Sequence, residues 1–263
     1  MAYGGPGSRR ERAQRLLPLF DAQLRFAEAL RAARGETLVH ALATYTNFYR
    51  RFGYGVPDAS GVPAGWTAYL EAADAAADHD ERLAVTVEHF VRGTTEQPLP
   101  GHVVFGCFSY TPPDDEGTVR IHFLDRQPDG GPGPLAGVNI PRRRAELARL
   151  TASILREHPE ARRIRGRSWL YQLEAYRRLF PPAYVEDPQI VDAGVTFWGS
   201  GCWGQFQRHR GIDEAAIEDF LTRLPMLDPE RPWRVMPLVP LTVVAPIEAF
   251  RLHYLAGEAL RGA

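Results

Sequence analysis

The first hundred residues place apolar side chains at the spacing of amphipathic helices. In segment 9–34 these side chains recur every three or four residues and stop at Gly35, a residue type common at helix ends. They are Leu16, Leu17, Phe20, Leu24, Ala27 and Leu30. The same spacing predicts helices over 36–52 and about 67–91, and the proline- and glycine-rich stretch 97–101 predicts a domain boundary near residue 100.

Beyond residue 101 the pattern changes to short β-branched and aromatic runs that alternate with helical segments. Strands are predicted at 102–110, 118–124, 162–168 and about 190–198, and helices at about 141–157, 170–179 and 213–224. Helices interleaved with strands favour an α/β sheet over separate helical and sheet domains. We therefore expect an α/β protein with a flexible lead-in at 1–8, a helical N-terminal region at 9–100 and a mixed sheet flanked by helices at 101–263.

Composition limits the class of protein. With 44% hydrophobic and 24% charged residues, the 263-residue chain is expected to form a globular core. No apolar run is long enough for a membrane span, and the N-terminus lacks the apolar stretch of a secretory signal. Cys107 and Cys202 are too few for a disulfide scaffold. These observations predict a cytoplasmic protein without a membrane partner.

The charge is small in total but uneven along the chain. The formal net charge is −1, there is no lysine, and residues 142–178 contain eleven arginines against four acids. Two interpretations stay open: a solvated basic face, or a site for an anionic ligand, because the planar guanidinium suits phosphate and carboxylate. Nucleic acid is not expected, since the whole chain is not basic and no aromatic–basic recognition motif is present.

Three patterns after residue 101 carry candidate chemistry. The loop Gln127-x-x-Gly130-x-Pro132 precedes a helix whose first turn contains three arginines, Arg142, Arg143 and Arg144. Tyr176 begins the sequence Tyr176-Arg177-Arg178-Leu179-Phe180 on the next predicted helix. The third pattern is the ordered series Ile121-His122-Phe123, Gly133-Pro134-Leu135, Ser168-Trp169-Leu170 and Leu179-Phe180-Pro181-Pro182.

Together these patterns resemble the GNAT family of acyl-CoA-dependent acyltransferases, in particular a group with a helical N-terminal domain and a GNAT-like C-terminal domain. The resemblance covers about residues 102–210. The sequence departs from the family where Pro132 stands in place of a glycine or alanine, where no proline follows His122, and where the glycine expected after Tyr176 is missing. It implies a GNAT-like mixed sheet and an acyl-CoA co-substrate.

The resemblance also assigns roles to individual residues. The pyrophosphate of acyl-CoA would lie at the loop and the helix N-terminus, where free N–H groups and the helix dipole favour an anion. The implied cofactor-binding residues are Gln127, Gly130, Gly131, Gly133, Arg142 and Arg143. The implied catalytic residues are His122 as base, Ser168 at the end of its strand and Tyr176 as the acid that protonates the leaving thiolate.

Other interpretations remain beside this one. His122 alternates with Ile121 and Phe123 and so faces away from them, but it could equally serve as a structural hydrogen-bonding residue, and Tyr176 as a core residue. No histidine or carboxylate spacing predicts a metal site. The segment Trp198–Gly204 is read as a bulged strand with its aromatics in the core or as a ligand-binding wall. The expected function is acyl transfer to an amine or hydroxyl of a small acceptor, with a non-catalytic binding or protein-interaction module as the alternative.

Overall fold

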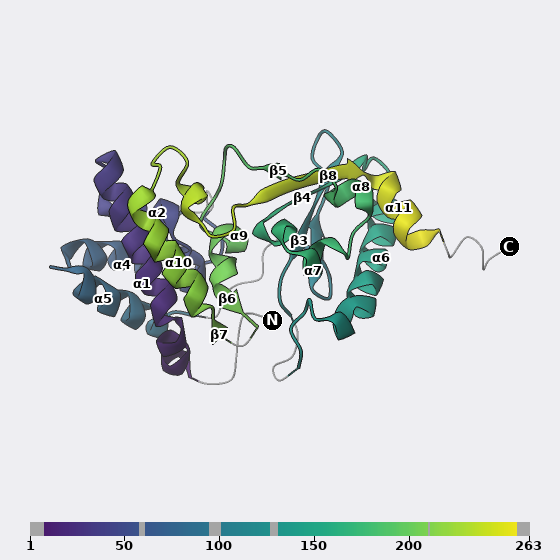
Figure 1. Cartoon of the computed structure of the whole chain (residues 1–263). Helices are drawn as coiled ribbons and strands as arrows, with labels where there is room; N and C mark the ends of the chain where they lie inside the picture. The colour runs from purple at the N-terminus through teal and green to yellow at the C-terminus, as the bar shows by residue number, and fades with distance from the viewer. Residues whose placement is uncertain (1–7, 58–60, 95–100, 127–130, 210, 257–263) are drawn as a thin grey trace. The chain divides into compact units, whose positions relative to one another are not determined.

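The structure is a computed structural model that describes residues 8–57, 61–94, 101–126, 131–209 and 211–256. It is a mixed α/β structure with a helix-rich N-terminal part and a six-stranded mixed sheet, which confirms the predicted fold class at that level (Figure 1). The predicted lead-in lies, except for Ser8, outside the described residues. No helix in the described ranges is both long enough and apolar enough to cross a membrane.

The chain forms two compact units. Unit 1 comprises residues 1–99 and 192–239, and unit 2 comprises residues 100–191 and 240–263. One limit between the units falls between residues 99 and 100. The second part of unit 1 differs from the predicted plan, which placed all of 101–263 in one domain.

The longest helix of unit 1 ends where its sequence signals predict. Helix α1 (Arg9–Arg34) begins with a capping box, in which the Ser8 hydroxyl accepts the Glu11 N–H and the Glu11 carboxylate accepts the Ser8 N–H. It ends at Gly35, whose φ of 65° is left-handed and therefore suits glycine. Local sequence alone accounts for both ends of this helix.

The two other predicted helices of this region are each divided in two. Helices α2 (Leu38–Tyr45) and α3 (Phe48–Arg51) separate at Thr46, whose hydroxyl donates to the Leu42 carbonyl, and at Asn47, whose N–H donates to buried Gln23. Helices α4 (Ala64–Ala75) and α5 (His79–Arg92) separate before Asp78, which caps α5 by accepting the Glu81 N–H at 2.9 Å. The predicted continuous helices at 36–52 and 67–91 are wrong in this respect.

Residues 192–239 complete the core of unit 1. They contain α9 (Ser200–Trp203), β6 (Gln207–Arg208), β7 (Gly211–Ile212), α10 (Glu214–Arg223) and the 3-10 helices η3 (Gly204–Phe206), η4 (Leu224–Met226) and η5 (Pro232–Val235). The ring of Phe26 on α1 packs against Phe197, Trp203 and Phe220, at centroid distances of 5.4, 5.5 and 5.7 Å. Because Phe26 and Trp203 are fully buried, this part of the chain belongs to the helical core.

Unit 2 is built around the six-stranded sheet, whose strand order is β1-β2-β3-β4-β8-β5. The strands are β1 (Val103–Phe105), β2 (Phe108–Thr111), β3 (Thr118–Phe123), β4 (Arg163–Ser168), β5 (Gln189–Ile190) and β8 (Leu241–Pro246). Strands β3 and β4 are parallel and are joined through η1 (Gly137–Asn139) and α6 (Ile140–Glu157), whereas the other neighbours are antiparallel. The remaining elements are η2 (Trp169–Gln172), α7 (Glu174–Arg177), α8 (Pro182–Val185) and α11 (Ile247–Leu255).

The two faces of this sheet differ in character. One face presents apolar side chains of β2, β3, β4 and β8 to the helices, and we call it the helix face. Its members include Phe108, Tyr110, Val119, Ile121, Phe123, Ile164, Val243 and Ala245. The Tyr110 hydroxyl lies 3.2 Å from Ser153 of α6, and the Tyr176 ring of α7 packs on Phe123. Helices α6 and α11 lie side by side (Figure 1).

The opposite side of the sheet, which we call the arginine face, carries polar residues at the alternate positions. The strand registers place Ser109, Arg120, His122, Arg163, Arg165, Arg167 and Thr242 on it. Arg120 and Arg167 are exposed, and Arg163 and Arg165 are half-buried. The alternation thus places apolar residues on the helix face and much of the basic charge of β3 and β4 on the arginine face.

Candidate functional site

The strand alternation places His122 on the arginine face, in a cluster with two residues that the sequence did not single out. Ser109 lies directly opposite His122 in the β2–β3 ladder. His102, just before β1, places its Nδ1 3.1 Å from the Ser109 hydroxyl, and the rings of His102 and His122 are 4.3 Å apart between centroids. A turn at Gly106-Cys107 folds β1 back on β2, whereas the sequence predicted one strand over 102–110, and that missed turn concealed the cluster.

His122 is held in its neutral form. Burial, together with the nearby His102 and Arg120, lowers its pKa from 6.5 to about 4. Its Nε2 is buried and has no hydrogen-bond partner among the residues that the structure describes. A neutral imidazole nitrogen without a partner can accept a proton or a hydrogen bond from a ligand.

The other two predicted catalytic residues lie on the helix face. The Ser168 hydroxyl accepts the Leu170 N–H at 3.1 Å and so caps η2. Tyr176 is 2% exposed and packs against Phe123 and Tyr171, and burial, reinforced by Tyr171, raises the pKa of its hydroxyl well above 10. The sheet therefore separates Ser168 and Tyr176 from His122.

The predicted cofactor loop is only partly described. Gln127 and Gly130 lie outside the described residues, while Gly131 and Gly133 lie in the segment that leads to η1. The Gly133 carbonyl accepts the Ala136 N–H at 3.0 Å and the Asn139 side-chain amide at 2.9 Å. Because Asn139 uses its amide in this way and provides no side-chain cap, the first N–H groups of α6 have no capping side chain.

The two predicted phosphate-binding arginines have different environments. Arg142 is exposed, with its Nε 3.4 Å from a Glu146 carboxylate oxygen. Arg143 is 1% exposed and donates to the same carboxylate at 2.7 Å and to the Cys107 sulfur. Glu146 also accepts the Cys107 N–H at 3.0 Å. The assignment of Arg143 to cofactor binding is therefore corrected: its guanidinium braces the β1–β2 turn from inside.

Arginines also gather between β3 and β4. Arg120 and Arg165 are directly opposite each other in the parallel ladder. Arg163 is neutralised locally, because it donates to Glu116 at 2.7 Å and to the Thr118 hydroxyl at 2.9 Å. The arginine-rich sequence 142–178 thus resolves into a buried brace, a helix surface and a basic patch on the sheet.

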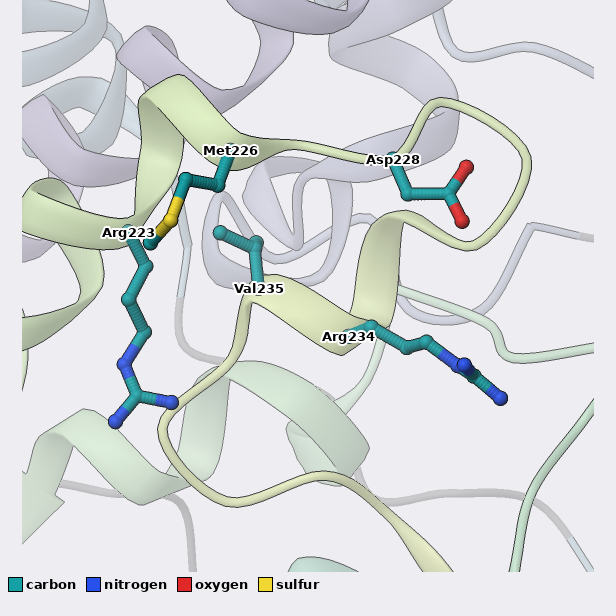
Figure 2. Close-up of a pocket in the computed structure, with 5 residues that line it drawn as sticks. All are labelled: Arg223, Met226, Asp228, Arg234 and Val235. Carbon is teal, nitrogen blue, oxygen red and sulfur yellow. The ribbon is translucent and has the colours of Figure 1, made fainter.

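A separate pocket lies within unit 1 and contains none of the predicted site residues. It has a volume of about 250 Å³ and is lined by Arg223, Met226, Asp228, Arg234 and Val235 (Figure 2). Arg223 is paired with Asp219 at 2.9 Å, and Arg234 approaches Asp192 at 3.6 Å. Both arginines of the pocket therefore already have acidic partners.

The described residues contain no group of three or more histidines, cysteines or acids arranged to hold a metal ion. The chain matches no protein-family model, and neither the curated proteins nor the solved structures contain a significant match to it.

Proposed function

We propose that this chain is an acyltransferase that moves an acyl group from acyl-CoA to an amine or hydroxyl of a small acceptor, with unit 2 as a GNAT-like domain. The observation that carries the proposal is that the parallel strands β3 and β4 pair over only part of their length. Their register runs from Thr118–Arg120 with Arg163–Arg165, whereas β3 continues to Phe123 beside β2 and β4 continues to Ser168 beside β8. Two parallel strands that stop pairing part-way are what the GNAT resemblance requires for the acyl-CoA arm.

The connection after β3 supports the same proposal. In the GNAT family the loop and helix that follow this strand hold the pyrophosphate. Here the corresponding helix, α6, has no side-chain cap, no acid in its first turn and an exposed Arg142, although the Ile140 N–H is bonded to the Gly137 carbonyl and Pro141 has no N–H. These features favour an anion at that end of the helix.

The proposed reaction uses groups from both sides of the sheet. Neutral His122 accepts the proton of the acceptor nucleophile, the nucleophile attacks the thioester carbonyl, and the C–S bond breaks as the acyl group is transferred. The proton that His122 took up then passes to the departing thiolate, and the Tyr176 hydroxyl, which keeps its own proton because its pKa is raised well above 10, would donate a hydrogen bond to that sulfur. A thioester lying in the unpaired stretch between β3 and β4 would be accessible from both faces.

The test is isothermal titration with acetyl-CoA, a longer acyl-CoA and free CoA. We expect micromolar binding that weakens in Arg142→Ala and is unchanged in Arg149→Ala, an exposed arginine further along α6. If folded protein gives no heat of binding with any of the three compounds, the proposal is refuted.

The second candidate is a non-catalytic GNAT-like binding module. It is favoured by the separation of His122 from Ser168 and Tyr176 and by the use of the Ser168 hydroxyl as a cap. An assay of free thiol released from acetyl-CoA in the presence of mixed small amines and alcohols distinguishes the two. CoA binding without any thiol release above the protein-free rate would favour the module.

A further inference from the structure

Two arginines face each other across the central parallel ladder of unit 2. Arg120 and Arg165 are register partners on β3 and β4, so their Cα atoms lie about 5 Å apart and their side chains leave the same face. Like charges directly opposite each other in a sheet are destabilising. This juxtaposition therefore costs the isolated fold stability.

Their surroundings compensate this charge only in part. The side chains of Arg120 and Arg165 make no hydrogen bond or ion pair with any residue that the structure describes, while Arg163, two residues before Arg165 on β4, has its own partner in Glu116. The carboxylate of Asp114 accepts the N–H groups of Glu116 and Thr118. Asp114 makes no ion pair with Arg120, but the hydrogen bond from Thr118 and the attraction between its charge and that of Arg120 both lower the pKa of the Asp114 carboxyl.

A potential proton acceptor lies beside the pair. His122 follows Arg120 by two residues on the same strand and so projects from the same face, about 7 Å further along. Its Nε2 is buried without a partner among the described residues. The arginine pair and an imidazole nitrogen without a partner among the described residues therefore lie on one face of the sheet.

We propose that Arg120 and Arg165 together bind an oxyanion, a phosphate or carboxylate group, of the acceptor, and thereby direct its nucleophile to His122. The two planar guanidinium groups can donate to several oxygens of one oxyanion, and this relieves their mutual repulsion. The claim that the bound oxyanion belongs to the acceptor rests on the proposed transfer reaction. The claim that the two arginines bind an oxyanion does not.

The test measures binding of inorganic pyrophosphate and citrate to the full chain by titration at low ionic strength. We expect each of Arg120→Gln and Arg165→Gln to weaken binding about tenfold or more, because charge-assisted hydrogen bonds are lost. Arg149→Gln makes the same change in net charge on exposed α6 and should leave binding unchanged. Arg165→Lys keeps the charge without the planar fork and should give intermediate affinity.

Three results would overturn the inference: no binding of either anion to the folded wild type, equal weakening in Arg149→Gln, or no effect in the two face variants. Each variant is first compared with wild type by thermal unfolding, so that a folding defect is not read as lost binding. The titrations are then repeated with saturating CoA. If CoA displaces the anions, the pair belongs to the CoA site and not to the acceptor, whereas unchanged binding supports the acceptor assignment. CoA binding with no anion binding would refute this inference alone. Anion binding with no CoA binding would refute the transferase, and with it the acceptor role, but not the anion site.

Discussion

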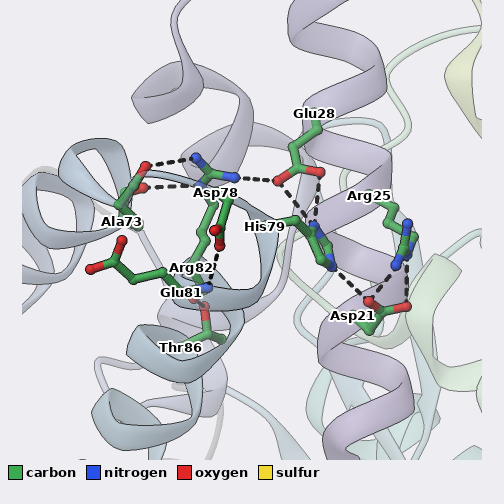
Figure 3. Close-up of polar contacts among 10 residues, drawn as sticks. Asp21, Arg25, Glu28, Ala73, Asp78, His79, Glu81, Arg82 and Thr86 are labelled. Atoms are coloured by element: carbon green, nitrogen blue, oxygen red, sulfur yellow. Dashed lines mark hydrogen bonds and ion pairs between the residues drawn. The ribbon is translucent and has the colours of Figure 1, made fainter.

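Arg82 connects three parts of unit 1 through one guanidinium. From α5 its Nε donates to the Ala73 carbonyl at 3.0 Å and its Nη2 to the Ala76 carbonyl at 3.3 Å, at the C-terminal end of α4 (Figure 3). Its Nη1 donates to Glu28 of α1 at 2.5 Å. The Arg82 side chain is 9% exposed, so water cannot readily replace these bonds.

We predict that Arg82→Met destabilises unit 1 by about 3 kcal/mol, because it removes three charge-assisted hydrogen bonds and leaves two helix-end carbonyls without this donor. Methionine retains the apolar stem, so packing loss is small. Glu28 still has His79 as a partner at 3.0 Å, which limits the cost. The assay is urea unfolding followed by tryptophan fluorescence, since four of the five tryptophans belong to unit 1.

Arg10→Met is the matched control. Its ion pair with Glu88 has side-chain exposures of 61% and 44%, and an exposed pair contributes about 0.5 kcal/mol. If Arg82→Met costs less than about 1 kcal/mol, or no more than Arg10→Met, the reasoning from buried hydrogen bonds is refuted.

The other predictions concern unit 2. Because the pKa of His122 is lowered to about 4, the unfolded chain binds more protons between pH 4 and 6.5, and stability falls as the pH drops through that window. His122 should account for a loss of about 2 kcal/mol between about pH 7.5 and about pH 5 in urea titrations, and His122→Asn should remove it. Glu146→Gln leaves buried Arg143 without its counter-charge and should cost about 3 kcal/mol, measured likewise; wild-type stability would contradict the buried pair. Gly106→Ala should lower the melting temperature strongly, because φ is +61° and the added Cβ would lie 2.0 Å from the Glu146 carboxylate, whereas Gly137→Ala, with no atom within 4 Å, should not.

The sequence predicted those elements whose signals are local. Helix α1 has both its capping box and its terminal glycine in the sequence, and α6 and β4 lie close to their predicted ranges. The break between α2 and α3 depends on buried Gln23, which is distant in sequence and accepts the Asn47 N–H. A contact of this kind does not alter the spacing of apolar residues, so the spacing predicted one continuous helix through the break.

The site was only partly predictable for the same reason. The alternation along the strand predicted that His122 points to the other face of the sheet from Ile121 and Phe123, and the β2–β3 register agrees. The first turn of α6 could not indicate that Arg143 points inward, because its partner Glu146 is also polar and the pair is buried as a unit. The aromatics at Trp203 lie in a core, as one interpretation held, but in a short helix of unit 1 and not in a bulged strand.

Each unit is built from two segments that are far apart in the sequence, so the order in which the ribosome synthesises them matters for folding. Unit 1 lacks the rings of Trp203 and Phe220 until the ribosome has passed them, and the sheet of unit 2 lacks β8, the neighbour of both β4 and β5, until residue 246. Both cores therefore stay open during almost the whole of translation, with apolar surface exposed to aggregation. A stop codon before Trp203 would leave two unfinished cores, one between residue 239 and β8 would leave only the core of unit 2 unfinished, and a nascent chain of this kind is expected to depend on chaperones for much of its synthesis.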